Sequence, residues 1–429
     1  MHTVGSYSIL DVTMDLLNEN EIASIAKQCG CCKVLNWRLE EISDKVIGYL
    51  GDHLKLIIEV ETKERKKQLN LFVKCMPRFD KWKAQYLREL TFFKKEYVIL
   101  SSLFEEFGNN EGSYRWRPKL LMAKEDIFVF EDVTKMGYVM PHHQSILSLD
   151  ILKATVGTLA RFHAQSIIHE EKKSKELGRP YRIWEDYSDY LQEPISGLDW
   201  RDTGRNAVIE FLKVHSKFKG EPNFNRHLEL VIPMLYDGAM ALMKPSTEYR
   251  NVVIHRDLWT NNIFVKNQGN SHHVLFVDFQ TVLYCTPMLD LSALIFFNTT
   301  RAGRKLYTND MIDVYYNAFA DALLLDGIDV ADIIDKDCLV KSYRESVMFG
   351  ITQAALIVPI IAMNSQKREE IFCNDETARK ANVVSRSEYF LEIASESTEY
   401  RNRLIDLFDE IVEKYMYPNE SKQNYKEKY

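Results

Sequence analysis

One stretch of the 429-residue chain constrains its fold more than any other: an island of strand-like sequence, residues 252–284, inside a long region of helical pattern. Within it, apolar runs flank a polar loop and a further run ends at an aspartate, in the order Val253-Ile254, His255–Asn262, Ile263-Phe264-Val265, Val274–Val277, Asp278. Two apolar runs around the turn Asn267–Asn270 predict a hairpin. The loop and the end of this hairpin would bring Asn262 and Asp278 together and place Asp257 nearby.

These oxygen-bearing side chains suit phosphoryl transfer. A γ-phosphoryl group is moved mainly by positioning and by neutralisation of charge, with one carboxylate meeting the attacking hydroxyl. An asparagine and a second carboxylate would hold Mg²⁺, which prefers oxygen ligands. Asp and Asn also cap ordinary loops. The His-x-Asp-x-x-x-x-Asn spacing, its flanking strands and the following Asp278-Phe279-Gln280 together favour a functional loop over chance.

The rest of the chain predicts an α+β fold. His53–Glu61 and Gln68–Met76 alternate around the charged turn Lys63–Lys67 and predict an antiparallel hairpin, and Lys119–Ala123 with Ile127–Asp132 predict another. Residues 81–107 are helical in pattern, and helical patterns dominate the chain after the second hairpin, apart from the island. We therefore expect a β-rich N-terminal domain, residues 1–132, and a helical C-terminal domain, residues 133–429.

Composition excludes several classes of protein. The net charge of −7 and the pI of about 6.0 argue against a nucleic-acid binder, which needs a basic footprint. Seven cysteines are too few for a disulfide scaffold, and no signal peptide is visible, so a cytoplasmic location is the default. The apolar stretch Val347–Met363 contains Gly, Gln and Pro and predicts a buried helix, so no membrane partner is expected.

Several of these motifs resemble those of a known family. Ile254–Phe264 and Val277–Gln280 look like the Brenner and metal-binding motifs of the choline kinase and aminoglycoside phosphotransferase clan. Within that clan, Leu258-Trp259, Asn261-Asn262 and Asp-Phe-Gln resemble the insect ecdysteroid kinase-like (CHK-type) family. Further matches are Phe72-Val73-Lys74, Phe130–Val133 before Gly137, and Leu159–Ala164. The resemblance spans roughly residues 46–417 and implies a two-lobed protein-kinase-like fold, with a β-rich N-lobe, a helical C-lobe and ATP between them.

The resemblance also implies roles in the island. Asp257 matches the catalytic residue that orients the substrate hydroxyl, and Asn262 and Asp278 match the Mg²⁺ ligands. His255 matches a brace of the catalytic loop, and Asp290 matches the aspartate that pins the backbone of that loop. Gln280 stands where relatives have an acidic or amide residue, and its contact with the metal stays open.

In the N-terminal domain the resemblance implies a nucleotide site. Lys74 matches the lysine that grips the α- and β-phosphates. Its partner is expected to be Glu96, with Glu89 as the alternative on nearly the same helical face. Backbone groups from Glu131 to Val133 would meet the adenine.

Two departures stand out. Gly48-Tyr49-Leu50-Gly51 is not a Gly-x-Gly-x-x-Gly phosphate loop, and Arg256 stands where the insect family usually has glycine.

His-Arg-Asp-Leu also matches protein kinases, but Asp-Phe-Gln and the short interval from Asp278 to Asp290 leave no room for a peptide-positioning segment. The pairs His142-His143 and His272-His273 complete no zinc or two-metal motif, which disfavours a metal hydrolase.

The expected function is ATP- and Mg²⁺-dependent phosphorylation of a hydroxyl group on a small molecule, which is the partner we expect. The resemblance implies an ecdysteroid or a similar steroid or xenobiotic alcohol. The alternatives are a choline- or ethanolamine-type kinase, and a pseudokinase that binds ligands without turnover.

Overall fold

The structure is a computed structural model that describes residues 16–31, 33–42, 51–62, 65–108, 110–194, 198–269 and 271–418. Residues 48–50 of the expected phosphate loop and residues 63–64 and 270 of the two predicted turns lie outside these ranges. By its contacts the chain divides into two compact units, residues 1–105 with 117–138, and residues 106–116 with 139–429. The expected mixed α+β class, with a β-rich N-terminal and a helical C-terminal part, is confirmed. The domain boundary at 132/133 stays a prediction.

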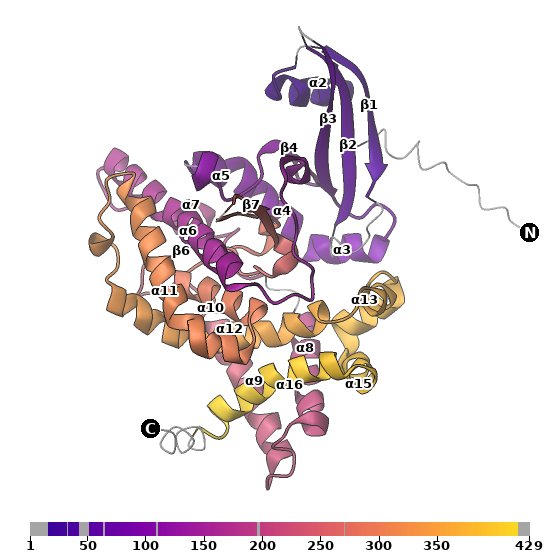
Figure 1. The fold of residues 1–429 in the computed structure, drawn as a ribbon, viewed down its shortest axis with the longest axis vertical. Helices are drawn as coiled ribbons and strands as arrows, with labels where there is room; N and C mark the ends of the chain where they lie inside the picture. Colours follow the sequence, from indigo (N-terminus) through magenta and orange to yellow (C-terminus); the bar gives the residue numbers. More distant parts are fainter. Residues whose placement is uncertain are drawn as a thin grey trace, which may run out of the picture. The chain divides into compact units, whose positions relative to one another are not determined.

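The first unit is built around one sheet (Figure 1). Its elements are α2 (Glu19–Gln28), β1 (Lys33–Glu41), β2 (Asp52–Glu61), β3 (Lys66–Cys75), α3 (Lys81–Glu89), α4 (Phe92–Val98), β4 (Leu120–Lys124) and β5 (Ile127–Glu131). The five strands are antiparallel in the order β1-β2-β3-β5-β4. Both predicted hairpins, β2–β3 and β4–β5, are present, whereas β1 was not anticipated.

The alternation of the strands decides which face of the sheet is buried. The core beneath α2 contains Leu54, Leu56, Ile58 and Val60 of β2 together with Leu71 and Val73 of β3. These are the residues that the period-two pattern places on one side of each strand. Helix α2 covers this face with Ile22, Ile25 and Ala26, and its N-terminus is closed by a capping box between Asn18 and Glu21.

The helical stretch 81–107 is divided rather than continuous. Helix α3 ends at Glu89, and Thr91 takes a left-handed conformation with φ 57° before α4 begins. A π-helical turn, Ile99–Leu103, and the short α5 (Phe104–Glu106) complete the stretch. A threonine with positive φ is rare, and nothing in the local sequence marks it, so this break was not predictable from pattern.

The second unit is mainly helical. It contains α6 (Leu149–Leu177), α7 (Trp184–Tyr187), α8 (Leu198–His215), α9 (Phe224–Ala241), β6 (Val252–Ile254), β7 (Ile263–Asn267), β8 (His272–Phe276), β9 (Leu283–Cys285), α10 (Pro287–Asn298), α11 (Arg301–Leu324), α12 (Lys336–Ile361), α13 (Ser365–Phe372), α14 (Asp375–Arg379), α15 (Ser387–Glu396) and α16 (Thr398–Tyr415). The predicted island forms two small antiparallel pairs, β6–β9 and β7–β8. The hairpin expected from residues 263–277 is β7–β8.

Helix α12 carries the apolar stretch 347–361 and packs against α10 and α16. Among the described residues it is the one helix whose length and hydropathy would allow a membrane crossing, and most of its apolar window is buried inside the protein. Gly350 lets α12 approach α10 closely, because a Cβ there would lie 2.8 Å from the backbone carbon of Ser292. The expected buried helix is therefore present.

Candidate active site

In the first unit, Lys74 and Glu96 form a buried ion pair. Lys74 lies near the end of β3, and its Nζ is 2.6 Å from Oε2 of Glu96 on α4. Both side chains are almost fully buried, and Lys74 also lies over the ring of Phe93. The alternative partner, Glu89, is exposed on α3 and accepts a hydrogen bond from Gln85. Of the two glutamates considered, Glu96 is the one paired with Lys74.

The segment expected to meet the adenine follows β5. Glu131 is the last residue of β5, opposite Leu71 of β3, and its Oε1 accepts a hydrogen bond of 2.6 Å from the backbone N–H of Lys119. Val133 is buried and opens a short 3₁₀ turn, Val133–Met136, that ends at Gly137 with φ 86°. The segment is thus held by the end of β5, which lies between β3 and β4, and by a capped turn. Its role stays a prediction.

In the second unit, the loop after β6 joins Asp257 to Asn262. The Nδ2 group of Asn262 donates to the Asp257 backbone carbonyl at 2.8 Å and to its carboxylate Oδ2 at 3.0 Å. The other carboxylate oxygen of Asp257, Oδ1, is buried and has no hydrogen-bond partner among the described residues. One oxygen is therefore fixed in place by Asn262, while the second makes no such bond, although the Trp259 side chain lies close enough to the carboxylate to favour its charged form.

Asp278 stands at the end of the β7–β8 hairpin, as expected. Its φ is 70°, a left-handed conformation that costs a residue with a Cβ roughly 1–2 kcal/mol. Strained backbone of this kind collects at functional sites. The Gln280 amide donates to Asp278 Oδ2 at 3.3 Å, so Gln280 orients this carboxylate directly. The backbone also links the two candidate metal ligands, because Val277 N–H donates to the Asn262 carbonyl at 3.1 Å.

His255 is fully buried and braces the loop from inside. Its Nε2 lies 3.0 Å from the Val277 carbonyl, and its Nδ1 accepts a hydrogen bond from the backbone N–H of Asp257 at 3.3 Å. Burial lowers the pKa of His255, so the ring is neutral with its proton on Nε2. The ring packs on Phe279 at 4.8 Å between centroids. His255 therefore couples the start of the loop to the strand that carries Asp278.

Asp290 fixes the backbone of the same loop. Its Oδ2 accepts a bond from His255 N–H at 2.6 Å, and its Oδ1 accepts one from Arg256 N–H at 2.8 Å. His163 of α6 approaches Oδ2 at 3.1 Å and is itself held by the Tyr315 hydroxyl at 2.8 Å. Burial lowers the pKa of His163, against the pull of Asp290. His163 lies in the motif Leu159–Ala164, which matches the family pattern but predicts no contact for this residue, and nothing in the sequence indicates Tyr315.

The electrostatics of Asp257 differ from those of an exposed carboxylate. Burial, followed by the neighbouring Asp278, raises the pKa of Asp257 to about 6, although Trp259, Arg256 and Asn262 oppose the shift. The residue still keeps part of its surface exposed. Perturbed carboxylates of this kind are found preferentially in functional sites.

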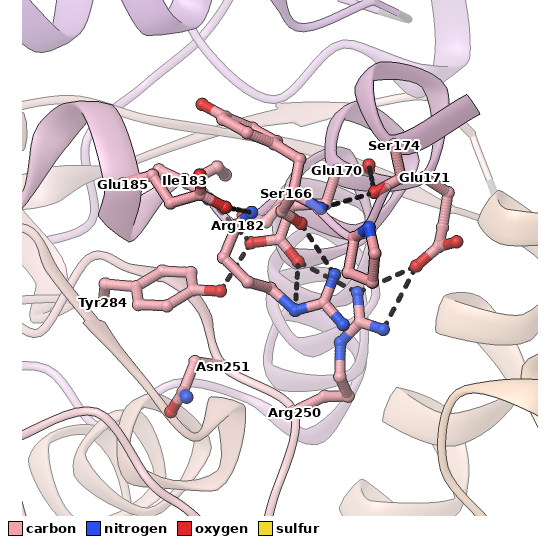
Figure 2. Close-up of polar contacts among 12 residues, drawn as sticks. Ser166, Glu170, Glu171, Ser174, Arg182, Ile183, Glu185, Arg250, Asn251 and Tyr284 are labelled. Carbon is pink, nitrogen blue, oxygen red and sulfur yellow. Dashed lines mark hydrogen bonds and ion pairs between the residues drawn. The ribbon is translucent and has the colours of Figure 1, made fainter. Parts of the chain in front are cut away.

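A buried polar network supports the strands below the loop (Figure 2). Glu170 of α6 is fully buried and accepts hydrogen bonds from the Tyr284 hydroxyl at 2.5 Å, Ile183 N–H at 3.1 Å and Arg250 Nη2 at 2.9 Å. One helical turn earlier, the hydroxyl of Ser166 accepts from Val253 N–H at 2.9 Å. Arg250 precedes β6 and Tyr284 lies in β9, so one face of α6 holds both strands that frame the loop.

The donor set fits a hard cation better than zinc. No group of three or more His, Cys, Asp or Glu side chains suited to a metal occurs in the described part of the chain. Of the histidine pairs that complete no metal motif, His143 contacts the Met363 carbonyl with its ring nitrogen Nε2. Asn262 and Asp278 offer oxygen atoms, and Mg²⁺ commonly binds one or two such side chains and completes its shell with phosphates and water.

Comparison with solved structures finds weak likeness to small-molecule kinases. An ethanolamine kinase from Plasmodium vivax is 14% identical with a TM-score of 0.37, over 85% of this chain and 87% of that one. A choline kinase from Streptococcus pneumoniae is 13% identical with a TM-score of 0.34, over 79% and 99%. At these values neither tells what this chain does. The search of curated proteins finds no significant match.

A comparison with models of protein families identifies the family of this chain. The model described as the ecdysteroid kinase-like family matches residues 45–326, well over half of the chain. This span includes Lys74, Glu96, the loop from His255 to Asn262, Asp278 and Asp290. The chain therefore belongs to the ecdysteroid kinase-like family and is a phosphotransferase that acts on an alcohol group.

Proposed function

We propose that the protein transfers the γ-phosphoryl group of ATP, with Mg²⁺, to a hydroxyl of an ecdysteroid or a similar steroid or xenobiotic alcohol. The observation that carries the proposal is the state of Asp257. Its Oδ2 is tied to Asn262, its Oδ1 is buried without a hydrogen-bond partner among the described residues, and Asp278 lies close enough to raise its pKa. A buried, unpaired carboxylate oxygen is costly and is compensated when a substrate hydroxyl donates to it.

In this scheme Asp257 accepts the hydrogen bond of the acceptor hydroxyl and turns its oxygen towards the phosphorus atom. Its Oδ1 is the atom that meets the hydroxyl, because Oδ2 is already engaged.

Asn262 and Asp278 would hold the metal. Because Nδ2 of Asn262 donates both of its bonds to Asp257, the side-chain oxygen is the atom left to bind a cation. Gln280 holds the carboxylate of Asp278 through a hydrogen bond to Oδ2. Bound Mg²⁺ supplies neutralisation of the phosphate charge.

Lys74 would bind the α- and β-phosphates. The ion pair with Glu96 fixes the direction of its ammonium group. The backbone from Glu131 to Val133 would bind the adenine, and this needs no particular side chain.

The test is transfer of labelled phosphate from ATP to ecdysone by the purified protein, with choline as the second acceptor. Asp257→Asn preserves the shape of the side chain and should lower kcat by about 100- to 10,000-fold, the range that general-base removal gives. Asp278→Ala should abolish the Mg²⁺-dependent rise in melting temperature with an ATP analogue, since ligand binding stabilises the native state.

A matched control is Asp186→Asn in the same unit. Asp186 is a half-exposed carboxylate that pairs with Lys173 and Tyr181, and its loss should leave turnover near that of the unaltered protein. Near-normal kcat in Asp257→Asn would contradict the mechanism. Transfer to choline alone would move the acceptor to the cationic alcohols, and nucleotide binding without any transfer would indicate a pseudokinase.

A further inference from the structure

Arg256 has the backbone conformation of a glycine and the surroundings of a core residue. Its φ is 73°, in the left-handed region that residues with a Cβ rarely adopt. The side chain is nevertheless almost fully buried. Glycine would take this conformation without strain, so the contacts of the side chain must offset the strain of the backbone.

Those contacts form a small, partly buried cluster of charge. Arg256 Nη1 donates to Oε2 of Glu193, in the segment between α7 and α8, and lies 3.7 Å from the sulfur of Met243. Arg201 of α8 donates to the other oxygen of Glu193, Oε1, at 2.5 Å and lies 4.0 Å from the same sulfur. Two arginines from different elements thus share one carboxylate, with one oxygen each.

The two arginines differ in what stands beside them. The backbone N–H of Arg256 is bound by Asp290, and the next residue is Asp257. Arg256 is therefore held at two points, by its backbone at Asp290 and by its guanidinium at Glu193. Arg201 makes the same kind of ion pair from helix α8, so among the described contacts it meets the loop only through the carboxylate and the sulfur atom that it shares with Arg256.

We propose that Arg256 is a positioning residue: the clamp of its guanidinium by Glu193 holds the left-handed turn that directs the unpaired oxygen of Asp257. This inference rests on the proposed function of Asp257. Without the clamp, the turn at position 256 keeps the bond from its backbone to Asp290 but loses the second point of attachment, and Asp257 keeps one fixed oxygen but loses the direction of the other. A displacement of about 1 Å at a reacting group can cost about 100-fold in rate.

The decisive variant is Arg256→Gly, because glycine removes the clamp and also relieves the backbone strain. We expect kcat for ecdysone phosphorylation to fall by about 10- to 100-fold, with the melting temperature and the KM for ATP close to those of the unaltered protein. A purely structural role would show the opposite pattern, a lower melting temperature with an unchanged kcat. Arg256→Lys, whose ammonium can still pair with Glu193, should recover part of the lost kcat.

Arg201→Gln is the matched control, since it breaks an ion pair to the same carboxylate from outside the loop. It should lower kcat by much less than Arg256→Gly does. Wild-type kcat in folded Arg256→Gly, or an equal loss of kcat in Arg201→Gln, would overturn the positioning role while leaving the proposed function intact. An unaltered protein that transfers no phosphate to ecdysone or choline would overturn both.

Discussion

Truncation of Glu170 to alanine tests most directly the network that supports the strands on either side of the loop from His255 to Asn262 (Figure 2). The carboxylate of Glu170 is the acceptor for three donors from separate parts of the second unit, the Tyr284 hydroxyl, Ile183 N–H and Arg250. After truncation Arg250 keeps its two bonds of 3.1 Å to Glu171. The hydroxyl of Tyr284 and the amide of Ile183 keep no such alternative acceptor in the described network.

The magnitude follows from these two orphaned donors. Each buried donor left without an acceptor costs about 1–3 kcal/mol, so Glu170→Ala should lose about 4 kcal/mol of unfolding free energy. Burial raises the pKa of Glu170, although Tyr284, Ile183, Arg250 and Arg182 all favour its charged form. The cost of removing the carboxylate from water therefore offsets part of the stabilisation that its ion pairs and hydrogen bonds provide. At roughly 2 cal/mol/K per residue, a unit of about 300 residues should melt about 6 °C lower.

The assay is thermal unfolding followed by circular dichroism, with two comparisons. Tyr284→Phe removes one donor and leaves the carboxylate in place, so it should cost about 1 kcal/mol. Lys173→Gln breaks a partly exposed ion pair to Asp186 from the same helix, which is worth less than about 1 kcal/mol. The reasoning is refuted if Glu170→Ala melts with the unaltered protein, or if Lys173→Gln loses as much as Glu170→Ala.

Three further predictions follow from the second unit. The two carboxylate oxygens of Asp290 accept hydrogen bonds from the backbone N–H groups of His255 and Arg256, and Asp290→Asn replaces one of these oxygens with an NH₂ group that cannot accept. The loop would shift, so kcat should fall at least tenfold with little change in the KM for ATP, measured by steady-state kinetics. Burial would raise the pKa of Glu413, but bonds from Arg301 and Lys217 outweigh it and lower the pKa to about 2. The ionised carboxylate therefore stabilises the folded protein above the unfolded pKa near 4.5, and this contribution is lost as the pH falls towards 2. Glu413→Gln should lower the free energy of unfolding at pH 7 and hardly change it at pH 2.5, as measured by urea unfolding. Gly350→Ala would press a methyl group against the backbone of α10 and should cost about 1–3 kcal/mol by the same measurement, and an unchanged midpoint would contradict that contact.

The parts of the fold that follow from the sequence are those with a local cause. The alternation in β2 and β3 was sufficient to predict the hairpin and its buried face, because a strand places every second side chain on the same side. Strand β1 was missed because its residues are mostly exposed or half-buried, so its apolar and polar positions hardly alternate. The interruption at Thr91 was missed because the residue itself gives no signal for a positive φ.

The candidate site divides in the same way. Asp257, Asn262 and Asp278 lie close together because the loop and the hairpin are short, so spacing alone could indicate them. The ion pair of Lys74 with Glu96 was harder, because two glutamates on the same helical stretch fitted and only the packing of α4 against β3 separates them.

Glu170 and Arg256 show what local sequence patterns cannot predict, namely contacts between residues that lie far apart in the chain. Glu170 stands in the run Glu170-Glu171-Lys172-Lys173, which by sequence is a solvated helix face, yet it is fully buried because Arg250 and Tyr284 reach it from 80 and 114 residues away. A buried charge requires partners, and partners that distant leave no local trace. Arg256 stood out in the sequence only as a departure from the family pattern that the chain resembles, and neither its backbone conformation nor its contacts were predicted. Its φ of 73° and its ion pair with Glu193, 63 residues earlier in the chain, become visible only in the structure, because neighbouring residues determine neither of them.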